Sequence, residues 1–140
     1  MIPDTNIYEL NSHRLYLEEI DKSQVIHIIK YTTYLIEKNS SNFLENFSEE
    51  DLVEVNKVSL TNDINNNLFF KYRKKKLSLS TIAIIQNNNL LIFTNSILFN
   101  FKLRNPIVVK PVSKDQNLVI KLFYEALVES EINNRFVKII

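Results

Sequence analysis

Glycine is absent from all 140 residues of this chain, and its absence limits how the backbone can turn. Glycine reaches positive φ angles without a steric penalty from Cβ, so every tight turn here must use another residue. Asparagine tolerates the left-handed region better than most residues do. We therefore expect the asparagine-rich segments to form turns and helix caps. These segments are 65–67, 87–89, Asn105 and 133–134.

The composition is that of one soluble globular domain. A hydrophobic fraction of 45% is enough for one core, and a net charge of +1 does not indicate disorder. No apolar run approaches the roughly 18–20 residues that a membrane span needs, and the N-terminal residues lack the pattern of a signal peptide. Because the chain has no cysteine, it has no disulfide framework, and the cytoplasm is its expected location. Abundant asparagine, isoleucine and lysine indicate an AT-rich genome.

Apolar residues at helical spacing predict two helical regions in the N-terminal half. The first covers residues 22–38, and the second runs roughly from residue 42 to residue 57. Each contains a capping box, and the box in the second region is also consistent with a separate helix that starts there. The two boxes are Asp21 with Gln24, and Ser48 with Asp51.

From residue 77 the apolar pattern becomes typical of strands. Residues 77–86 and 90–99 are β-rich runs separated by three asparagines, which predicts a β-hairpin. We expect a third strand over residues 107–112, and its flanking prolines favour an edge position. The remaining expected elements are a helix from 114 to about 131, capped by Ser113 and Gln116, and a final strand over 136–140.

These elements predict a single α+β domain over residues 1–140. A helical N-terminal half packs on a small antiparallel sheet, with one C-terminal helix and a final short strand. The helical part, about residues 1–67, has 12 acidic and 5 basic side chains, whereas residues 68–140 have 4 acidic and 12 basic ones. An exposed strand edge within 77–99 would allow pairing between two chains, and hence a homodimer.

Familiar catalytic motifs are lacking in this sequence. P-loops, dinucleotide fingerprints and the nucleophile elbow all require glycine. Metal sites need clustered ligands, whereas the two histidines, His13 and His27, do not have zinc-site spacing. His13 and His27 could act as the acid–base pair of a nuclease. We favour a structural role for His27 at the border of a helix, because the sequence does not show that the two side chains meet. We predict no catalytic, cofactor-binding or metal-binding residues, and therefore a protein that is not an enzyme.

The charge pattern favours a non-enzymatic protein-binding module, a class that includes small inhibitors, immunity proteins, adaptors and interaction proteins of viruses or mobile elements. An acidic segment suits a basic partner protein. The predicted partner-binding residues are Glu45, Glu49, Glu50, Asp51 and Glu54.

Nucleic-acid binding is the alternative hypothesis. Five cations in six positions follow two phenylalanines, a composition that suits phosphate contacts and base stacking. If residues 62–76, which fit either a helix or a strand, form a helix, the element order resembles that of a winged helix-turn-helix protein with 77–99 as the wing. Two features argue against nucleic-acid binding: the helix before this run is acidic, and the net charge of the chain is close to neutral. The predicted contact residues are Lys71, Tyr72, Arg73, Lys74, Lys75 and Lys76.

Overall fold

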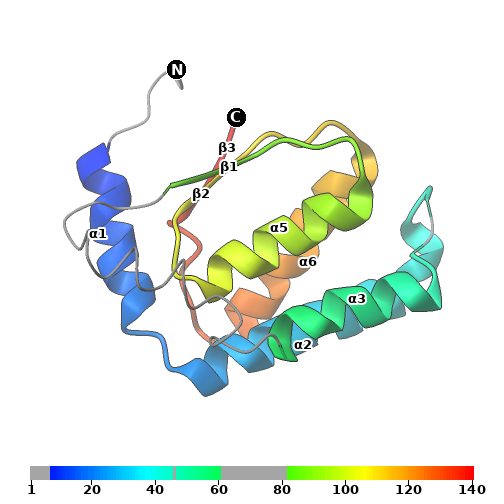
Figure 1. The fold of residues 1–140 in the computed structure, drawn as a ribbon, viewed down its shortest axis with the longest axis horizontal. Coiled ribbons are helices and arrows are strands. Elements are labelled where there is room, and N and C mark those ends of the chain that lie inside the picture. The colour runs from blue at the N-terminus through cyan, green and yellow to red at the C-terminus, as the bar shows by residue number, and fades with distance from the viewer. Residues whose placement is uncertain (1–6, 46, 61–81) are drawn as a thin grey trace.

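The computed structural model describes residues 7–45, 47–60 and 82–140, and these ranges contain five α-helices and a three-stranded sheet (Figure 1). None of the described helices has both the length and the apolar content to cross a membrane. In chain order, the elements are α1 (Ile7–Glu18), α2 (Lys22–Lys38), the 3-10 helix η1 (Ser40–Asn42), α3 (Glu49–Leu60), β1 (Ala83–Ile85), α5 (Leu90–Lys102), β2 (Ile107–Val109), α6 (Lys114–Glu129) and β3 (Val137–Ile139).

The sheet is parallel throughout, with the strand order β1-β2-β3. Ala83 pairs with Ile107, and Ile107 pairs in turn with Val137. Parallel neighbours need a crossover connection, which α5 and α6 provide. The antiparallel sheet predicted from the sequence is therefore wrong, and the C-terminal half is a β-α-β-α-β unit.

The predicted hairpin fails because residues 90–102 form α5 and not a strand. Asn89 does not belong to a hairpin loop. It caps α5 instead, because its side-chain oxygen accepts the N–H of Ile92 at 2.9 Å. The buried residues of α5 include Phe93, Ile97 and Phe101, which recur at helical spacing. The β-branched and aromatic residues of this run favour strands locally, but packing on both neighbouring layers selects the helix.

The predicted third strand exists, but it is shorter than expected and lies in the middle of the sheet. All three residues of β2 are buried, so the predicted edge position is wrong. The strand ends at Val109, before the second flanking proline. Pro106 precedes it and offers its carbonyl to the N–H of Ala83 at 2.9 Å. Neither proline therefore has to donate a hydrogen bond within the sheet.

Most predicted helix starts are confirmed. The N–H of Asp21 donates to Gln24 at the start of α2, at 3.3 Å. Ser48 and Asp51 exchange reciprocal side-chain–backbone hydrogen bonds of 3.0 and 3.1 Å. This capping box begins a separate helix, α3, and the chain before it turns through η1. The C-terminal helix and the final strand are also present, as α6 and β3.

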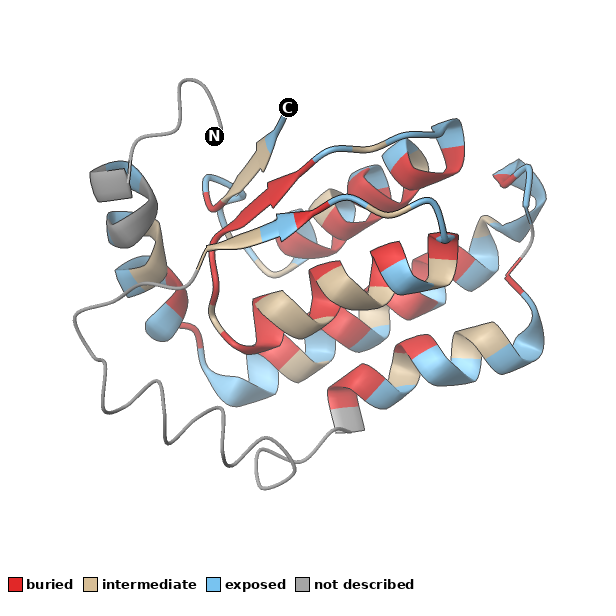
Figure 2. Ribbon diagram, turned by 45° about the horizontal axis from the view of Figure 1, so that its top comes forward, coloured by how far each residue is buried: buried red, intermediate tan, exposed pale blue. Residues whose placement is uncertain are grey.

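The described elements stack in layers, and the buried residues lie between them (Figure 2). Helices α5 and α6 cover one face of the sheet, and α2 packs against both α6 and α3. Three fully buried rings join the layers: Phe101, Phe123 and Phe136 have centroid separations of 5.4, 5.5 and 6.2 Å. This aromatic cluster ties β3 to α5 and α6.

The left-handed turns do not fall on asparagine as expected. Among the described residues, positive φ angles occur at Arg104 (62°) and Glu131 (59°). The guanidinium of Arg104 donates to the carbonyls of Lys102 and Ile20, at 2.6 and 2.9 Å. These bonds offset the backbone strain, since left-handed non-glycine residues cost roughly 1–2 kcal/mol. They also tie the α1–α2 connection to the end of α5.

Candidate protein-binding surface

The predicted acidic segment gathers around the start of α3. Glu49, Glu50 and Asp51 occupy its first turn, Glu45 lies in the connection before it, and Glu54 follows one turn later. Carboxylates in a first turn are stabilised by the helix dipole, by about 0.3–1 kcal/mol each. Part of this charge therefore supports the helix whether or not a partner binds.

Three of these five residues line two different hollows of the surface. Glu45 and Asp51 line a pocket of about 310 Å³ together with Asn88 and Asn89 of the β1–α5 connection. Glu49 instead lines a separate groove between α2 and α3. We call Glu45, Glu50, Asp51 and Glu54 the acidic surface. All four are exposed except Asp51, which is partly buried.

A buried carboxylate fixes the chain beneath the acidic surface. Asp115, in the first turn of α6, is only 5% exposed. Its two oxygens accept the backbone N–H groups of Leu44 and Glu45, at 2.8 and 2.7 Å. A bidentate contact of this kind holds the η1–α3 connection against the N-terminus of α6. The backbone at Glu45 is therefore held in place beside the pocket.

A second buried side chain joins the connections that follow β1 and β2. Gln116 accepts the N–H of Val112 at 2.9 Å and donates to the carbonyl of Asn87 at 2.5 Å. The predicted capping box is thus half formed: Ser113 accepts the N–H of Gln116, whereas the Gln116 side chain reaches one residue further back. Both connections lie at the carboxyl ends of parallel strands, where α/β proteins commonly bind ligands.

The pocket has a chemistry suited to a cation with several N–H groups. Two carboxylates and two carboxamides surround it, and Phe47, Leu90 and Leu91 complete its lining. One Asp51 oxygen already accepts the N–H of Ser48, and the Asn89 side-chain oxygen accepts the N–H of Ile92, so both residues also serve as helix caps. The remaining acceptors match the donors of a lysine or arginine side chain.

Sequence reasoning missed the residues that hold this surface together. No role was predicted for Asp115, and Gln116 was predicted only as the second half of a capping box. Asn88 and Asn89 were predicted to be turn or cap residues, and not to line a pocket. Nothing in the sequence indicated that their side chains would meet residues 44–51, because the contact spans about seventy residues between Asp115 and Leu44.

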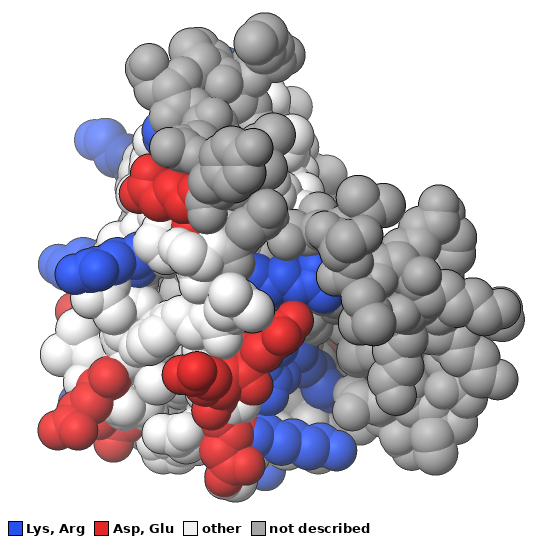
Figure 3. All heavy atoms as spheres, turned by 90° about the vertical axis from the view of Figure 1, so that its left-hand side faces the viewer, with Lys and Arg blue, Asp and Glu red and all other residues white. Residues whose placement is uncertain are grey.

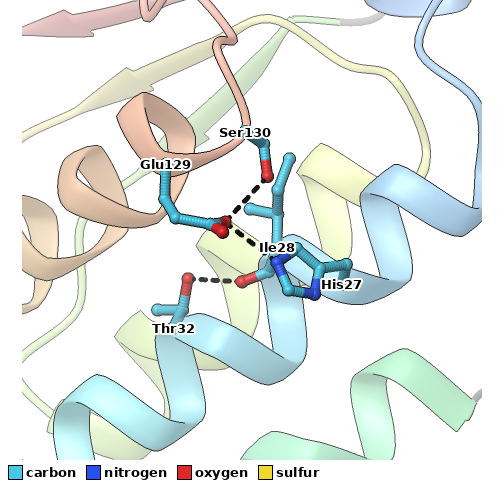
Figure 4. Close-up of polar contacts among 5 residues, drawn as sticks. All are labelled: His27, Ile28, Thr32, Glu129 and Ser130. Carbon is cyan, nitrogen blue, oxygen red and sulfur yellow. Dashed lines mark hydrogen bonds and ion pairs between the residues drawn. The ribbon is translucent and has the colours of Figure 1, made fainter.

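The two histidines have separate carboxylate partners. His27 of α2 lies 2.9 Å from Glu129 of α6, and Ser130 contacts the same carboxylate oxygen at 3.3 Å (Figure 4). His13 lies 3.7 Å from Glu9 on its own helix. No group of three or more metal-binding side chains occurs within the described residues. We interpret His27 as a surface tie between α2 and α6.

Replacing His27 by glutamine should lower the free energy of unfolding by less than about 1 kcal/mol, because solvent-exposed side-chain pairs of this kind contribute little. The two side chains are 54% and 45% exposed. Urea unfolding monitored by circular dichroism measures this change. Glu129→Gln should give the same small loss, and a loss above about 2 kcal/mol in either variant would contradict a surface role.

Charges on the opposite end of the molecule are mixed. Figure 3 views the side away from the η1–α3 connection, and there the described acidic and basic side chains lie next to one another. Such a face has no single sign of charge to attract a partner over a distance. The acidic surface is thus the better candidate for charge-guided docking.

The predicted nucleic-acid contacts, Lys71 to Lys76 with Tyr72 and Arg73, lie outside the described residues. The winged arrangement proposed for them is wrong in one respect, because α5 replaces the second strand of the wing. β1 pairs in parallel with β2 and forms no hairpin. The predicted strand edge within 77–99 does exist, because β1 is an edge strand of the parallel sheet. A homodimer that pairs through this edge stays a prediction.

The sequence and the fold were also compared with known proteins. Protein-family models, curated proteins and solved structures all give no match to this chain.

Proposed function

We propose that this chain is a non-enzymatic protein-binding module whose acidic surface docks a basic region of another protein. The observation that carries the proposal is the placement of Glu45 and Asp51 in the lining of one pocket, beside the connection that follows β1. Asp115 holds the backbone there through two hydrogen bonds of 2.8 and 2.7 Å. A surface that is ordered before binding loses less conformational entropy on association.

The pocket gives this surface a means of choosing its partner. A volume of about 310 Å³ can accommodate one long side chain, and its polar lining offers carboxylate and carboxamide oxygens. We propose that a lysine or arginine of the partner enters it, while the exposed Glu50 and Glu54 attract the surrounding basic residues. Arginine is enriched at the energetic centres of interfaces, and such charge pairing speeds association.

Reversing three charges of the acidic surface should release the partner. The variant Glu45→Lys/Glu50→Lys/Glu54→Lys leaves Asp51 in place, because that residue caps α3. We expect co-purification of the partner from the source cells to fall about tenfold or more, since like charges then face each other. Quantitative mass spectrometry of the captured proteins measures the change.

A matched control carries the same change in net charge elsewhere. Glu19, Glu125 and Glu131 are exposed and lie outside the acidic surface, so Glu19→Lys/Glu125→Lys/Glu131→Lys should retain the partner. Equal loss from both triple variants, or retention by the acidic-surface variant, would show that the partner does not dock there.

A further inference from the structure

A groove of about 570 Å³ runs between α2 and α3. Its lining residues recur at helical spacing along both helices, so each helix contributes one stripe of side chains. The residues that matter are Lys30, Tyr34 and Glu37 on α2, and Glu49, Val53 and Lys57 on α3.

The groove is polarised by charge along its length. Helices α2 and α3 are joined by the short connection 39–48 and run side by side in opposite directions (Figure 1). Glu37 near the end of α2 and Glu49 at the start of α3 therefore share one end of the groove. Lys30 and Lys57 share the other end, about 10–12 Å away at the helical rise per residue.

Apolar side chains lie between the two charged ends of the groove, together with the polar Thr33 and Asn56. Tyr34 lies between Lys30 and Glu37 along α2, and Val53 lies midway between Glu49 and Lys57 along α3. Their exposed fractions are 52% and 55%, and Leu52 lines the groove beside them. A central apolar area with a charged rim is the usual anatomy of a protein interface.

We infer that this groove is occupied by the same groove of a second copy of the chain. The two copies would be related by a two-fold axis that lies in the interface, crosses the middle of the groove and is perpendicular to its length. This rotation makes the grooves of the two copies run in opposite directions. The acidic end of each copy then meets the basic end of the other, while Tyr34 and Val53 meet their counterparts. An interface that is complementary to itself under this rotation is the requirement for a closed dimer. The four helices would pack as a bundle.

Glu54 and Lys38 lie beside the groove and weaken the attraction between the two copies. Lys57 pairs with Glu54 at 3.0 Å, and with side chains 60% and 52% exposed, this pair is weak enough to be shared with a partner. Lys38 lies 6.0 Å from the centre of the Tyr34 ring and flanks the acidic end. Because the apolar centre is small, we expect a dissociation constant of about 1–100 μM.

Sedimentation equilibrium of the full chain and of two charge variants tests the inference. Lys30→Glu/Lys57→Glu makes the groove uniformly acidic, and Glu37→Lys/Glu49→Lys makes it uniformly basic. Each variant alone should dimerise about tenfold or more weakly, because like charges then meet at both ends. An equimolar mixture should recover the affinity of the unmodified chain, since opposite charges meet again at both ends.

An apolar variant supplies an independent check. Val53→Glu should abolish the dimer, whereas Val128→Glu on α6, where the side chain is 72% exposed, should not. Circular dichroism confirms that each variant is folded. A chain that stays monomeric up to about 1 mM, or charge variants that each dimerise normally, would overturn the inference. The groove variants leave Glu45 and Glu50 intact, so failure here is distinguishable from failure of the acidic surface to dock a partner.

Discussion

Replacing Phe136 by alanine should lower the free energy of unfolding by about 3–5 kcal/mol, the largest effect that we expect from a single substitution. The ring is fully buried, stacks on Phe101 at 5.5 Å and meets the edge of Phe123 at 6.2 Å. Its removal would leave a cavity at the point where β3 joins α5 and α6, and packing there is too dense to collapse fully. Urea unfolding followed by circular dichroism measures the loss.

Ile139→Ala is the control for this substitution, because Ile139 lies in β3 but is 47% exposed. It should cost about 1 kcal/mol or less, since little of the side chain is removed from water. A Phe136→Ala variant no less stable than Ile139→Ala would mean that the aromatic cluster does not hold the layers together.

Replacing Asp115 by alanine should lower the free energy of unfolding by about 2–3 kcal/mol, because two backbone donors lose a charged acceptor. The same change should free residues 44 and 45 from the N-terminus of α6 and so disturb the acidic surface. Hydrogen exchange measured by NMR should show the N–H groups of Leu44 and Glu45 exchanging at least about tenfold faster.

Asp115→Asn tests how much of the stability and of the anchoring of residues 44 and 45 depends on the second carboxylate oxygen. It keeps one oxygen acceptor and should therefore lose about half as much stability as the alanine variant. If the exchange of the Leu44 and Glu45 amides stays unchanged in both variants, Asp115 does not anchor the connection, and the proposed order of the acidic surface loses its basis.

Local signals in the sequence were sufficient for most helices. The capping pairs at Asp21, Ser48 and Ser113, followed by apolar residues at helical spacing, predicted where α2, α3 and α6 begin. These signals succeed because a helix start satisfies its free N–H groups with residues only a few positions away. The start of β2 after Pro106 and the presence of β3 were likewise predicted from short apolar runs, whereas the end of β2 was placed three residues too late.

The parallel sheet was not predictable from the same kind of signal. Residues 90–102 contain phenylalanine, isoleucine and threonine, which favour strands, and three asparagines before them fit a hairpin loop as well as a helix cap. The apolar residues of this segment fit both the helical period of 3.6 residues and the strand period of two. Local propensity therefore could not decide between a helix and a strand. Burial of α5 between the sheet and α3 decides it, and that contact connects distant parts of the chain.

The sequence predicted the negative charge of the candidate surface, but not how its residues are arranged. Composition indicated an acidic segment, but it could not indicate that Glu49 lines the α2–α3 groove, whereas Glu45 and Asp51 line the pocket with Asn88. This division depends on the β-α-β unit, which brings the β1–α5 connection beside the start of α3. The anchoring role of Asp115 depends on the same long-range arrangement.

Site-specific photo-crosslinking in the source cells is the most direct test of the proposed docking surface. The variants Glu50→benzoylphenylalanine and Glu125→benzoylphenylalanine place the same reactive group on the acidic surface and on an exposed position of α6. The account predicts a discrete adduct with a protein rich in lysine or arginine at the first position, and its absence at the second. The same adducts at both positions, or adducts at the second position alone, would contradict it.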